Sequence, residues 1–458
     1  MKEAVHTSDL FAGEARYPLD WIDEYVTRIR AYVHVRARDN LLIKIPNEAF
    51  KLNPPGVRIL KRLFAGEKVL TLWQSFGGSI EVRRDLYDFF IALKQALQGC
   101  LNEHRPPAAV SVQPFALGLS ELPVLSEVAL TYRCNSRCRF CYAGCGRPKH
   151  DNGPEMTTTQ VKRVLRIIRD DVETPSVSFT GGEPTLREDL DELVSFARHD
   201  AGLHVNLITN GTLIDRTRAR ALKKAGLDSA QVSLESPREP VHDALTGMPG
   251  SFRSAVAAIR HLIDAGVRVH TNTTLTRANI DAAPDMAAFV RHLGLDRFSM
   301  NLMIPTEETE KDAPDLCLMY TEMSEHILRI QRAAEDVKVE FMWYSPTPIC
   351  VFNPIEHRLG NKGCAACDGL FSISPSGDVL PCSSWAEPVG NILSTPFEQI
   401  WQSAPARRLR AKRFAPEGCP DCEHFALCQG GCPLYWRQFG YGELQSRQKG
   451  HCHAVAGR

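Results

Sequence analysis

The sequence has no excess of charge of either sign, because it contains 54 Lys and Arg residues and 54 Asp and Glu residues. A balanced charge argues against a nucleic-acid binder that depends on bulk electrostatic attraction. No uninterrupted apolar run approaches the roughly 20 residues that span a bilayer. The start of the chain, MKEAVHTSDLFAGEARYPLD, also lacks the apolar stretch of a signal peptide. We therefore expect a cytoplasmic protein with no nucleic-acid or membrane partner.

Cysteine, in contrast, is abundant, with 15 residues in a chain of 458. A chain of this length exceeds one hydrophobic core, so two or three domains are expected. Secreted disulfide scaffolds are small, whereas clustered cysteines in a large cytosolic chain more often bind metal or take part in catalysis. The clustering therefore favours metal or iron–sulfur chemistry.

The first quarter of the chain, residues 1–105, predicts a small α+β domain of the winged-helix kind. Alternating apolar residues over 32–45 indicate a pair of strands. Helical patterns follow over 53–67 and 83–100, the second with a clear apolar face. Residues 106–123 are rich in proline and predict a linker to the next domain.

Residues 124–340 alternate between strand and helix patterns. Six runs predict strands: SEVAL, SVSF, VNLIT, AQVSL, VRVHTNTTL and FSMNLMI. The clearest helix between them covers 251–266, with Ser251 as its expected N-cap. This alternation predicts a parallel α/β sheet, either an open barrel or a doubly wound sheet. Sites in such sheets lie at the carboxyl ends of the strands.

The loop CNSRCRFCYAGC comes directly after the first predicted strand and carries Cys134, Cys138 and Cys141. Three thiolates can reach one metal centre from a single loop, whereas an iron–sulfur cube normally takes four cysteines. An incomplete protein shell leaves a position where a substrate can bind the metal. The arginines within the loop are expected to offset part of the thiolate charge. The alternative is a zinc loop completed by Cys145 or His150.

A second motif, FTGGEPTL, follows the second predicted strand and should lie beside the thiol loop. The paired glycines Gly181 and Gly182 let a ligand approach backbone groups closely. Glu183 can accept hydrogen bonds from an ammonium group. The two motifs together are a much more specific signal than either alone.

These motifs resemble the radical S-adenosylmethionine (radical SAM) superfamily, over roughly residues 124–305. The resemblance implies a partial (β/α)6 barrel whose three loop cysteines hold a [4Fe–4S] cluster. The amino and carboxylate groups of SAM then bind the fourth iron. One electron cleaves SAM to methionine and a 5'-deoxyadenosyl radical, which abstracts hydrogen from a substrate. The SAM-contacting residues that the resemblance implies are Phe140, Gly181, Gly182, Glu183, Ser233, Glu235 and Asn272.

One run, VHDALTGMPGSF, departs from the family pattern. Relatives often carry an arginine shortly after the His-Asp pair of strand four, where it contacts the SAM carboxylate. Thr246 stands near that place in this sequence, and Arg253 is the candidate substitute. His242 and Asp243 are expected to have structural roles.

The last segment, residues 341–458, is rich in Gly and Pro and holds nine of the fifteen cysteines. We expect it to fold around metal rather than around an apolar core. Its order of G-x4-C, CxxC-x5-C-x3-C and a late cysteine resembles the SPASM domain, a twin-cluster extension of peptide-modifying radical SAM enzymes. That resemblance implies two auxiliary [4Fe–4S] clusters, one on Cys419, Cys422, Cys428 and Cys452, the other on Cys364, Cys367, Cys382 and Cys432. Cys350 is a rival for one of the upstream places, and a pair of zinc ribbons is the alternative.

The basic run RRLRAKR, residues 407–413, is expected to be a solvated helix face. The N-terminal domain resembles the peptide-binding element PqqD, the small chaperone of pyrroloquinoline-quinone biosynthesis, with the matching stretch at 52–69. In that family a leader peptide adds as an extra strand to the sheet edge. The alternative is a winged-helix domain that merely caps the enzyme.

We therefore expect an oxygen-sensitive radical SAM enzyme that modifies a ribosomally made precursor peptide, most simply by oxidative crosslinking, with epimerisation as the alternative. The expected electron donor is a small carrier such as flavodoxin or ferredoxin. A related alternative is maturation of a folded protein, as in anaerobic sulfatase activation, or of a porphyrin. An alternative of another class is a non-catalytic zinc-binding interaction protein. The sequence identifies no proton acceptor.

Overall fold

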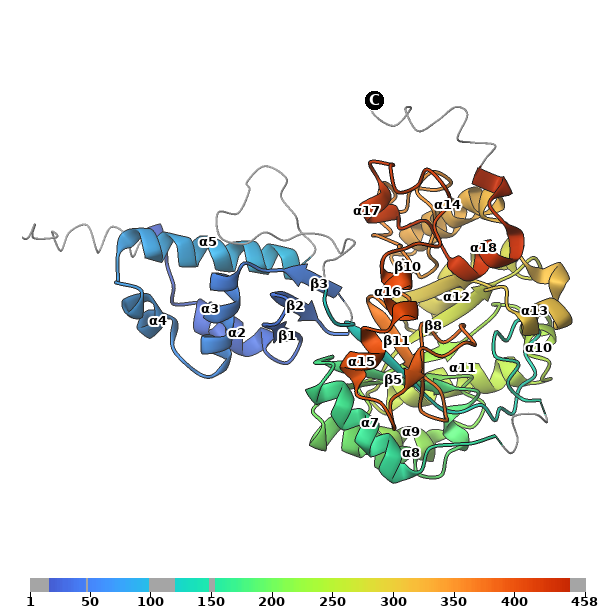
Figure 1. Ribbon diagram of the computed structural model, residues 1–458. Helices are drawn as coiled ribbons and strands as arrows, with labels where there is room; N and C mark the ends of the chain where they lie inside the picture. The colour runs from blue at the N-terminus through green and yellow to red at the C-terminus, as the bar shows by residue number, and fades with distance from the viewer. Residues whose placement is uncertain (1–15, 47, 99–119, 148–152, 445–458) are drawn as a thin grey trace, which may run out of the picture. The chain divides into compact units, whose positions relative to one another are not determined.

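The structure is a computed structural model and describes residues 16–46, 48–98, 120–147 and 153–444. The chain folds as two compact units, Met1–Val124 and Leu125–Arg458, which we call the first and the second unit (Figure 1). Within the described ranges, no helix is long and apolar enough to cross a membrane.

The first unit combines a three-stranded antiparallel sheet, in the order β1-β2-β3, with four described helices (Figure 1). Its elements are α2 (Ile22–Ile29), β1 (Val33–Arg36), β2 (Leu41–Lys44), β3 (Glu48–Lys51), α3 (Pro54–Phe64), α4 (Val69–Ser75) and α5 (Ile80–Leu97). The predicted strand pair and both predicted helices are confirmed. Strand β3 and helices α2 and α4 have no counterpart in the sequence-based prediction, because each is short, with four, eight and seven residues.

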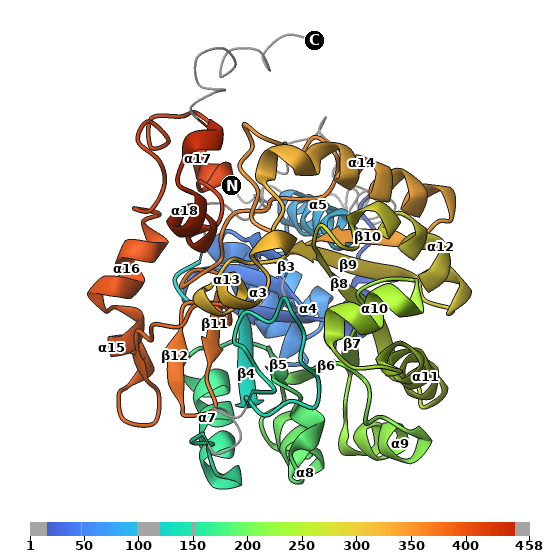
Figure 2. The ribbon, with the colours of Figure 1, turned by 90° about the vertical axis from the view of Figure 1, so that its right-hand side faces the viewer.

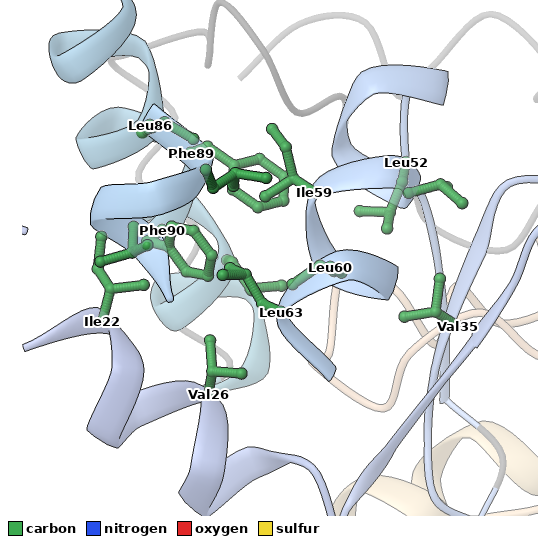
Figure 3. Packing of buried hydrophobic residues seen from close by; sticks show 14 of the residues in the cluster. Ile22, Val26, Val35, Leu52, Ile59, Leu60, Leu63, Leu86, Phe89 and Phe90 are labelled. Carbon is green, nitrogen blue, oxygen red and sulfur yellow. The ribbon is translucent and has the colours of Figure 1, made fainter. Parts of the chain in front are cut away.

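Helices α2, α3 and α5 bury their apolar faces against one another, as Figure 3 shows. The rings of Phe89 and Phe90 on α5 meet edge to face with their centroids 4.9 Å apart. Gly56 permits the close contact between α3 and α5, since a Cβ there would lie 2.9 Å from the Phe89 ring. This core supports the small sheet independently of any cluster or cofactor.

The second unit is built on one ten-stranded sheet, in the order β10-β9-β8-β7-β6-β5-β4-β11-β12-β13. Strands β4 to β10 are all parallel, and helices α7, α8, α9, α11 and α12 line the outside of the curved sheet (Figure 2). The seven parallel strands are β4 (Leu125–Thr131), β5 (Ser176–Gly181), β6 (His204–Thr209), β7 (Ser229–Ser233), β8 (Arg268–Leu275), β9 (Arg297–Leu302) and β10 (Glu340–Trp343). The helices between them are α7 (Thr158–Asp170), η1 (Pro184–Leu186), α8 (Leu190–Ser195), η2 (Phe196–Asp200), α9 (Arg216–Ala225), α10 (Glu239–Thr246), α11 (Ser251–Asp264), η3 (Ile280–Ala282), α12 (Asp285–His292), α13 (Glu307–Asp312), η4 (Pro314–Leu316) and α14 (Tyr320–Asp336). All six predicted strands are present, and β10 is a seventh.

The inner face of this sheet is polar. Along β8, buried residues alternate with the half-exposed His270, Asn272 and Thr274. Asn272 donates to Asn301 of β9 at 2.8 Å, and His270 lies 3.1 Å from the amide oxygen of Gln231 on β7. Because side chains alternate across a strand, one face packs under the helices while the other presents hydrogen-bonding groups.

The C-terminal segment extends the same sheet and has a core of its own. Its elements are β11 (Leu370–Ile373), β12 (Asp378–Leu380), β13 (Gly390–Asn391), α15 (Phe397–Trp401), α16 (Ala404–Arg410), α17 (Phe425–Cys428) and α18 (Pro433–Phe439). Strand β11 pairs in parallel with β4, and Phe371, Phe397 and Trp401 pack together behind it. The expectation that this segment folds around metal alone is therefore wrong. The domain boundary at residues 340 and 341 stays a prediction.

Candidate active site and auxiliary cysteine site

The thiol loop, residues 134–147, follows β4 and is held on one side by the turn after β5. The amides of Gly182 and Glu183 donate to the carbonyls of Thr131 and Arg133 at 2.7 and 2.9 Å. A Cβ on Gly182 would lie 2.2 Å from the Arg133 carbonyl oxygen, and one on Gly181 2.1 Å from that of Thr131. The paired glycines are thus required by the backbone of residues 131–133, which lead into the thiol loop, and their contact with SAM stays a prediction.

On its other side the thiol loop contacts the C-terminal end of α10. The amides of Arg137 and Arg139 donate to the carbonyls of Thr246 and Leu245 at 2.9 and 3.0 Å. Gly247 has a left-handed backbone with φ of +63°, and a Cβ there would lie 2.7 Å from the Arg137 carbonyl. Thr246, at the place of the family's arginine, therefore supports the loop through its backbone.

Two further contacts orient the loop. Asn210, directly after β6, donates from Nδ2 to the side-chain oxygen of Asn135 at 2.9 Å. Phe140 packs with Leu245 and Met303 in an apolar cluster. Asn210 was missed by the sequence analysis, and the signal for it is its place at the end of the third parallel strand, in the run TNGT.

The residues after the His-Asp pair organise the next helix. Asp243 accepts hydrogen bonds from the amides of Gly250 and Phe252, at 2.6 and 2.9 Å, and from the Ser251 hydroxyl at 3.0 Å. Asp243 of α10 therefore caps α11, and the prediction that Ser251 is the N-cap is wrong. Arg253 is 78% exposed and pairs with a glutamate of α10 at 2.9 Å.

The three thiols of the loop lie within electrostatic reach of one another. Burial raises the pKa of Cys134 to about 11, and burial together with the neighbouring Cys141 raises the pKa of Cys138. A hydrogen bond from the Cys145 thiol lowers the pKa of Cys141 to about 6. Backbone amides of Ser136 and Cys145 donate to the sulfurs of Cys134 and Cys141 at 3.4 and 3.3 Å. Amide donors of this kind stabilise thiolates, the protonation state that binds iron.

This donor set fits an iron–sulfur cluster, which takes soft thiolate ligands. Among the residues that the structure describes, no three His, Cys, Asp or Glu side chains are gathered closely enough for a single metal ion. A zinc ion needs four ligands at about 2.0–2.3 Å from one centre, whereas a cube distributes its cysteines over several irons. Three thiolates from one loop suit a cube that leaves one iron open. His150, the other proposed zinc ligand, lies outside the described residues.

Two arginines at the thiol loop form ion pairs with carboxylates. Arg133 pairs with Glu155 at 3.0 Å, and Arg139 pairs with Asp315 at 3.2 Å. Arg133 and Arg139 therefore already have acidic partners, and the expected offset of the thiolate charge by Arg137 stays a prediction.

Glu183 ties the turns after β5 and β6 together. Its fully buried carboxylate accepts from the amide of Thr185 at 3.0 Å, the hydroxyl of Thr209 at 2.8 Å and the amide of Asn210 at 2.8 Å. Burial raises the pKa of this carboxyl, and the hydrogen bonds oppose that shift. Its contact with the SAM amino group stays a prediction.

The remaining predicted SAM contacts gather at the ends of β7 and β8. Ser233 and Asn272 are paired in register. Glu235 is buried, which raises its pKa to about 8, and it accepts from the amide of Thr274 at 2.8 Å. The ring of His242 accepts from the amide of Glu235 at 3.1 Å, which is a structural role. The structure thus brings these residues together, and their roles toward SAM stay predictions.

A second group of thiols gathers around β11 and β12. Its members are Cys364, Cys367, Cys382 and Cys432. Burial raises the pKa of each, and the charge of Cys364 adds to the effect on Cys367, Cys382 and Cys432. These four thiols therefore lie in mutual electrostatic reach, as the ligands of one cluster would.

The other predicted auxiliary set is only partly described. Cys419, Cys422 and Cys428 are half-buried, and Cys452 lies outside the described residues. Cys350 is exposed, and the amide of the preceding Ile349 donates to the sulfur of Cys428 at 3.3 Å. The backbone of the rival Cys350 therefore adjoins this set, and its part in either cluster stays a prediction.

Comparison with known families supports this arrangement. Residues 128–290 match the radical SAM superfamily model, and residues 364–423 match SPASM, described as an iron-sulfur cluster-binding domain. An AdoMet-dependent heme synthase of Nitratidesulfovibrio vulgaris is 30% identical over 66% of this chain and 85% of the relative. A PqqA peptide cyclase of Gluconobacter oxydans is also 30% identical, over 68% of this chain and 86% of the relative.

Solved structures share the fold. SuiB of Streptococcus suis, bound to its precursor peptide SuiA, matches with a TM-score of 0.66 and 17% identity, over 88% of this chain and 95% of SuiB. The enzyme anSMEcpe, with bound AdoMet and a peptide, matches with a TM-score of 0.53 and 18% identity, over 71% of this chain and 97% of its own. The second unit is less than three quarters of the chain, so the SuiB match must reach into the first unit. The chain therefore belongs to the radical SAM superfamily, as an enzyme that binds S-adenosylmethionine and [4Fe–4S] clusters and carries a SPASM domain for auxiliary clusters.

Proposed function

We propose that the chain is a peptide maturase that reductively cleaves SAM and oxidatively crosslinks a ribosomally made precursor peptide. The observation that carries this proposal is the extent of the fold match to SuiB, an enzyme solved with its precursor peptide, because that match reaches into the first unit. The relationship to PqqA peptide cyclases, which act on a peptide by name, adds support.

In this proposal Cys134, Cys138 and Cys141 hold the catalytic cluster, and the backbone contacts described above fix their loop. When bound, the cluster and SAM supply the radical that removes hydrogen from the substrate. The polar inner face of the sheet, with Asn272 and His270, offers hydrogen bonds that can orient substrate groups. The auxiliary clusters position the substrate or accept the electron that remains after hydrogen abstraction, and a flavodoxin or ferredoxin supplies the first electron.

The first unit is proposed to bind the leader peptide at the outer edge of β3, which pairs with β2 alone among the described strands. In the register of β2 and β3, Leu52 donates to Asn40 at 2.8 Å, so the alternate residues 48 and 50 also turn their backbone groups toward β2. Ala49 must then direct its amide and carbonyl groups away from β2. An extended peptide can pair with these groups by β-augmentation.

The test of this edge is Ala49→Pro, which removes one outward amide and spares the bonds to β2. Ala49→Val is the matched control, since it keeps the amide and suits a strand. We expect the proline variant to lose most leader-dependent turnover while SAM cleavage without peptide is unchanged. Equal leader affinity for both variants, measured by fluorescence anisotropy, would refute the edge-binding proposal.

The substrate class is tested separately by anaerobic reconstitution with SAM and a reductant. A peptide encoded beside the gene is expected to lose two hydrogens by mass spectrometry, in step with formation of 5'-deoxyadenosine. The competing candidate is a porphyrin, because the chain is equally similar to a heme synthase. Conversion of an iron porphyrin, with no change in any neighbouring peptide, would replace the peptide proposal with that candidate.

A further inference from the structure

The basic run 407–413 contains a cation that is buried beside the auxiliary cysteines. The side chain of Lys412 is 0% exposed, and its ammonium donates to the carbonyl of Cys364 at 2.5 Å. It also lies 2.9 Å from the carboxylate of Asp368, whose side chain is 4% exposed. A solvated helix face would leave this lysine in water, so the prediction for the run is wrong at this residue.

A second cation from the same run approaches the neighbouring cysteine. Arg410 is half-buried, stacks over Trp401 with its guanidinium carbon 4.7 Å from the ring centroid, and donates to the Cys367 carbonyl at 3.4 Å. Among nearby charges, Arg410 does most to lower the pKa of Cys367, and Lys412 does most to lower that of Cys364, although burial outweighs both. These two cations therefore favour the thiolate forms.

The backbone has an unusual conformation both at the cysteine pair and at the buried lysine. Cys367 and Lys412 have left-handed φ values of +50° and +51°, which residues with a side chain seldom adopt. Such conformations persist where the surrounding structure enforces them, and they concentrate at functional sites. Burying a lysine is also costly unless it is paired and hydrogen-bonded. Asp368 and the Cys364 carbonyl provide that compensation.

We propose that Lys412 and Arg410, with Asp368 as counter-ion, set the reduction potential of the auxiliary cluster on Cys364 and Cys367. This inference rests on the proposed ligand assignment. Each added electron makes a thiolate-bound cluster more negative, so a fixed cation nearby stabilises the reduced form. The effect is larger in a buried environment, where charges are weakly screened. Lys412 and Arg410 thus act on the cluster through their positive charge and not as ligands.

The test uses the full chain, reconstituted anaerobically, in a Cys138→Ala background that removes the catalytic cluster. Reduction of the auxiliary clusters is followed by electron paramagnetic resonance during a redox titration. We expect Lys412→Met to move the midpoint of one cluster to lower potential. Asp368→Asn, which removes the opposing charge, is expected to move the same midpoint to higher potential.

Opposite shifts from the two members of one ion pair separate a charge effect from a structural one. Arg408→Gln is the control, because Arg408 lies in the same run and is exposed. Arg410→Gln is expected to shift the midpoint in the same direction as Lys412→Met. It replaces Lys412→Met in the test if the Lys412→Met protein cannot be reconstituted with clusters. Shifts of the same sign in Lys412→Met and Asp368→Asn, or no shift, would overturn the inference.

Cys364→Ala distinguishes failure of this inference from failure of the ligand assignment. It is expected to abolish the signal that the charge variants shift. If that signal survives, the assignment is wrong and the inference falls with it. If the signal is lost but the charge variants leave the midpoint unchanged, only the role of Lys412 and Arg410 is refuted.

Discussion

The two described cysteine sites of the second unit are supported in different ways. Around Cys138, the loop is held mainly by hydrogen bonds between backbone groups, and glycines permit them at distances that any side chain would prevent. Around Cys364, the supporting groups are buried charged side chains, Lys412 above all. Two cations at the first site, Arg133 and Arg139, are instead paired with acids.

This difference matches two different tasks. A loop gripped through its backbone keeps its ligands in place while one side of the centre stays free for SAM and substrate. A thiol set beside buried cations has a more favourable environment for an added electron. The comparison indicates that the first site is shaped for access and the second for charge.

The largest effect is expected from Cys138→Ala, which removes a proposed ligand of the catalytic cluster. We expect no formation of 5'-deoxyadenosine, together with loss of about four of about twelve irons per chain. Iron analysis and product chromatography measure the two quantities on the same sample. Retained SAM cleavage would show that Cys138 is not a ligand and would remove the basis of the comparison.

Gly182→Ala tests the backbone contacts that hold the thiol loop, and it leaves every cysteine in place. Its new Cβ would lie 2.2 Å from the Arg133 carbonyl oxygen, so the thiol loop must move. We expect SAM cleavage to fall by roughly 100-fold, as for other small displacements of catalytic groups. The control is Gly442→Ala, where a Cβ would meet no atom within 4 Å and φ is not left-handed. Equal rates for both variants would mean that the loop does not depend on this contact.

The smallest effect is expected from Arg139→Gln. This side chain and its partner Asp315 are 44% and 64% exposed, and exposed pairs contribute less than about 1 kcal/mol. We expect both SAM cleavage and the midpoint of the catalytic cluster to change little. A clear fall in that midpoint would show that charge also tunes the open site, and the contrast between the two sites would then be lost.

The strands and the thiol loop could be predicted from the sequence because both leave local signals. Each of the six strands is a short apolar run bounded by helical patterns, and the spacing of Cys134, Cys138 and Cys141 is specific by itself. Strand β11 left no such signal, since its place beside β4 depends on partners about 245 residues away in the sequence, as for Ser372 and Glu127.

The errors also have physical causes. Asp243 replaces Ser251 as the cap of α11 because the turn between two helices brings its carboxylate to the first amides, which no local pattern reveals. Lys412 belongs to a run that reads as a solvated surface, and only the tertiary position of Asp368 makes its burial possible. Charge runs alone therefore cannot distinguish a surface cation from a buried one.

The pairing of β11 with β4 has a consequence for how such enzymes can be recombined. Leu370 to Ile373 align in register with Leu125 to Val128, on the strand that leads into the thiol loop. A one-residue slip would turn every side chain of β11 to the opposite face. Chimeras that exchange the C-terminal region must therefore also exchange the matching edge of β4. The two segments have to be transferred together, although they are far apart in the sequence.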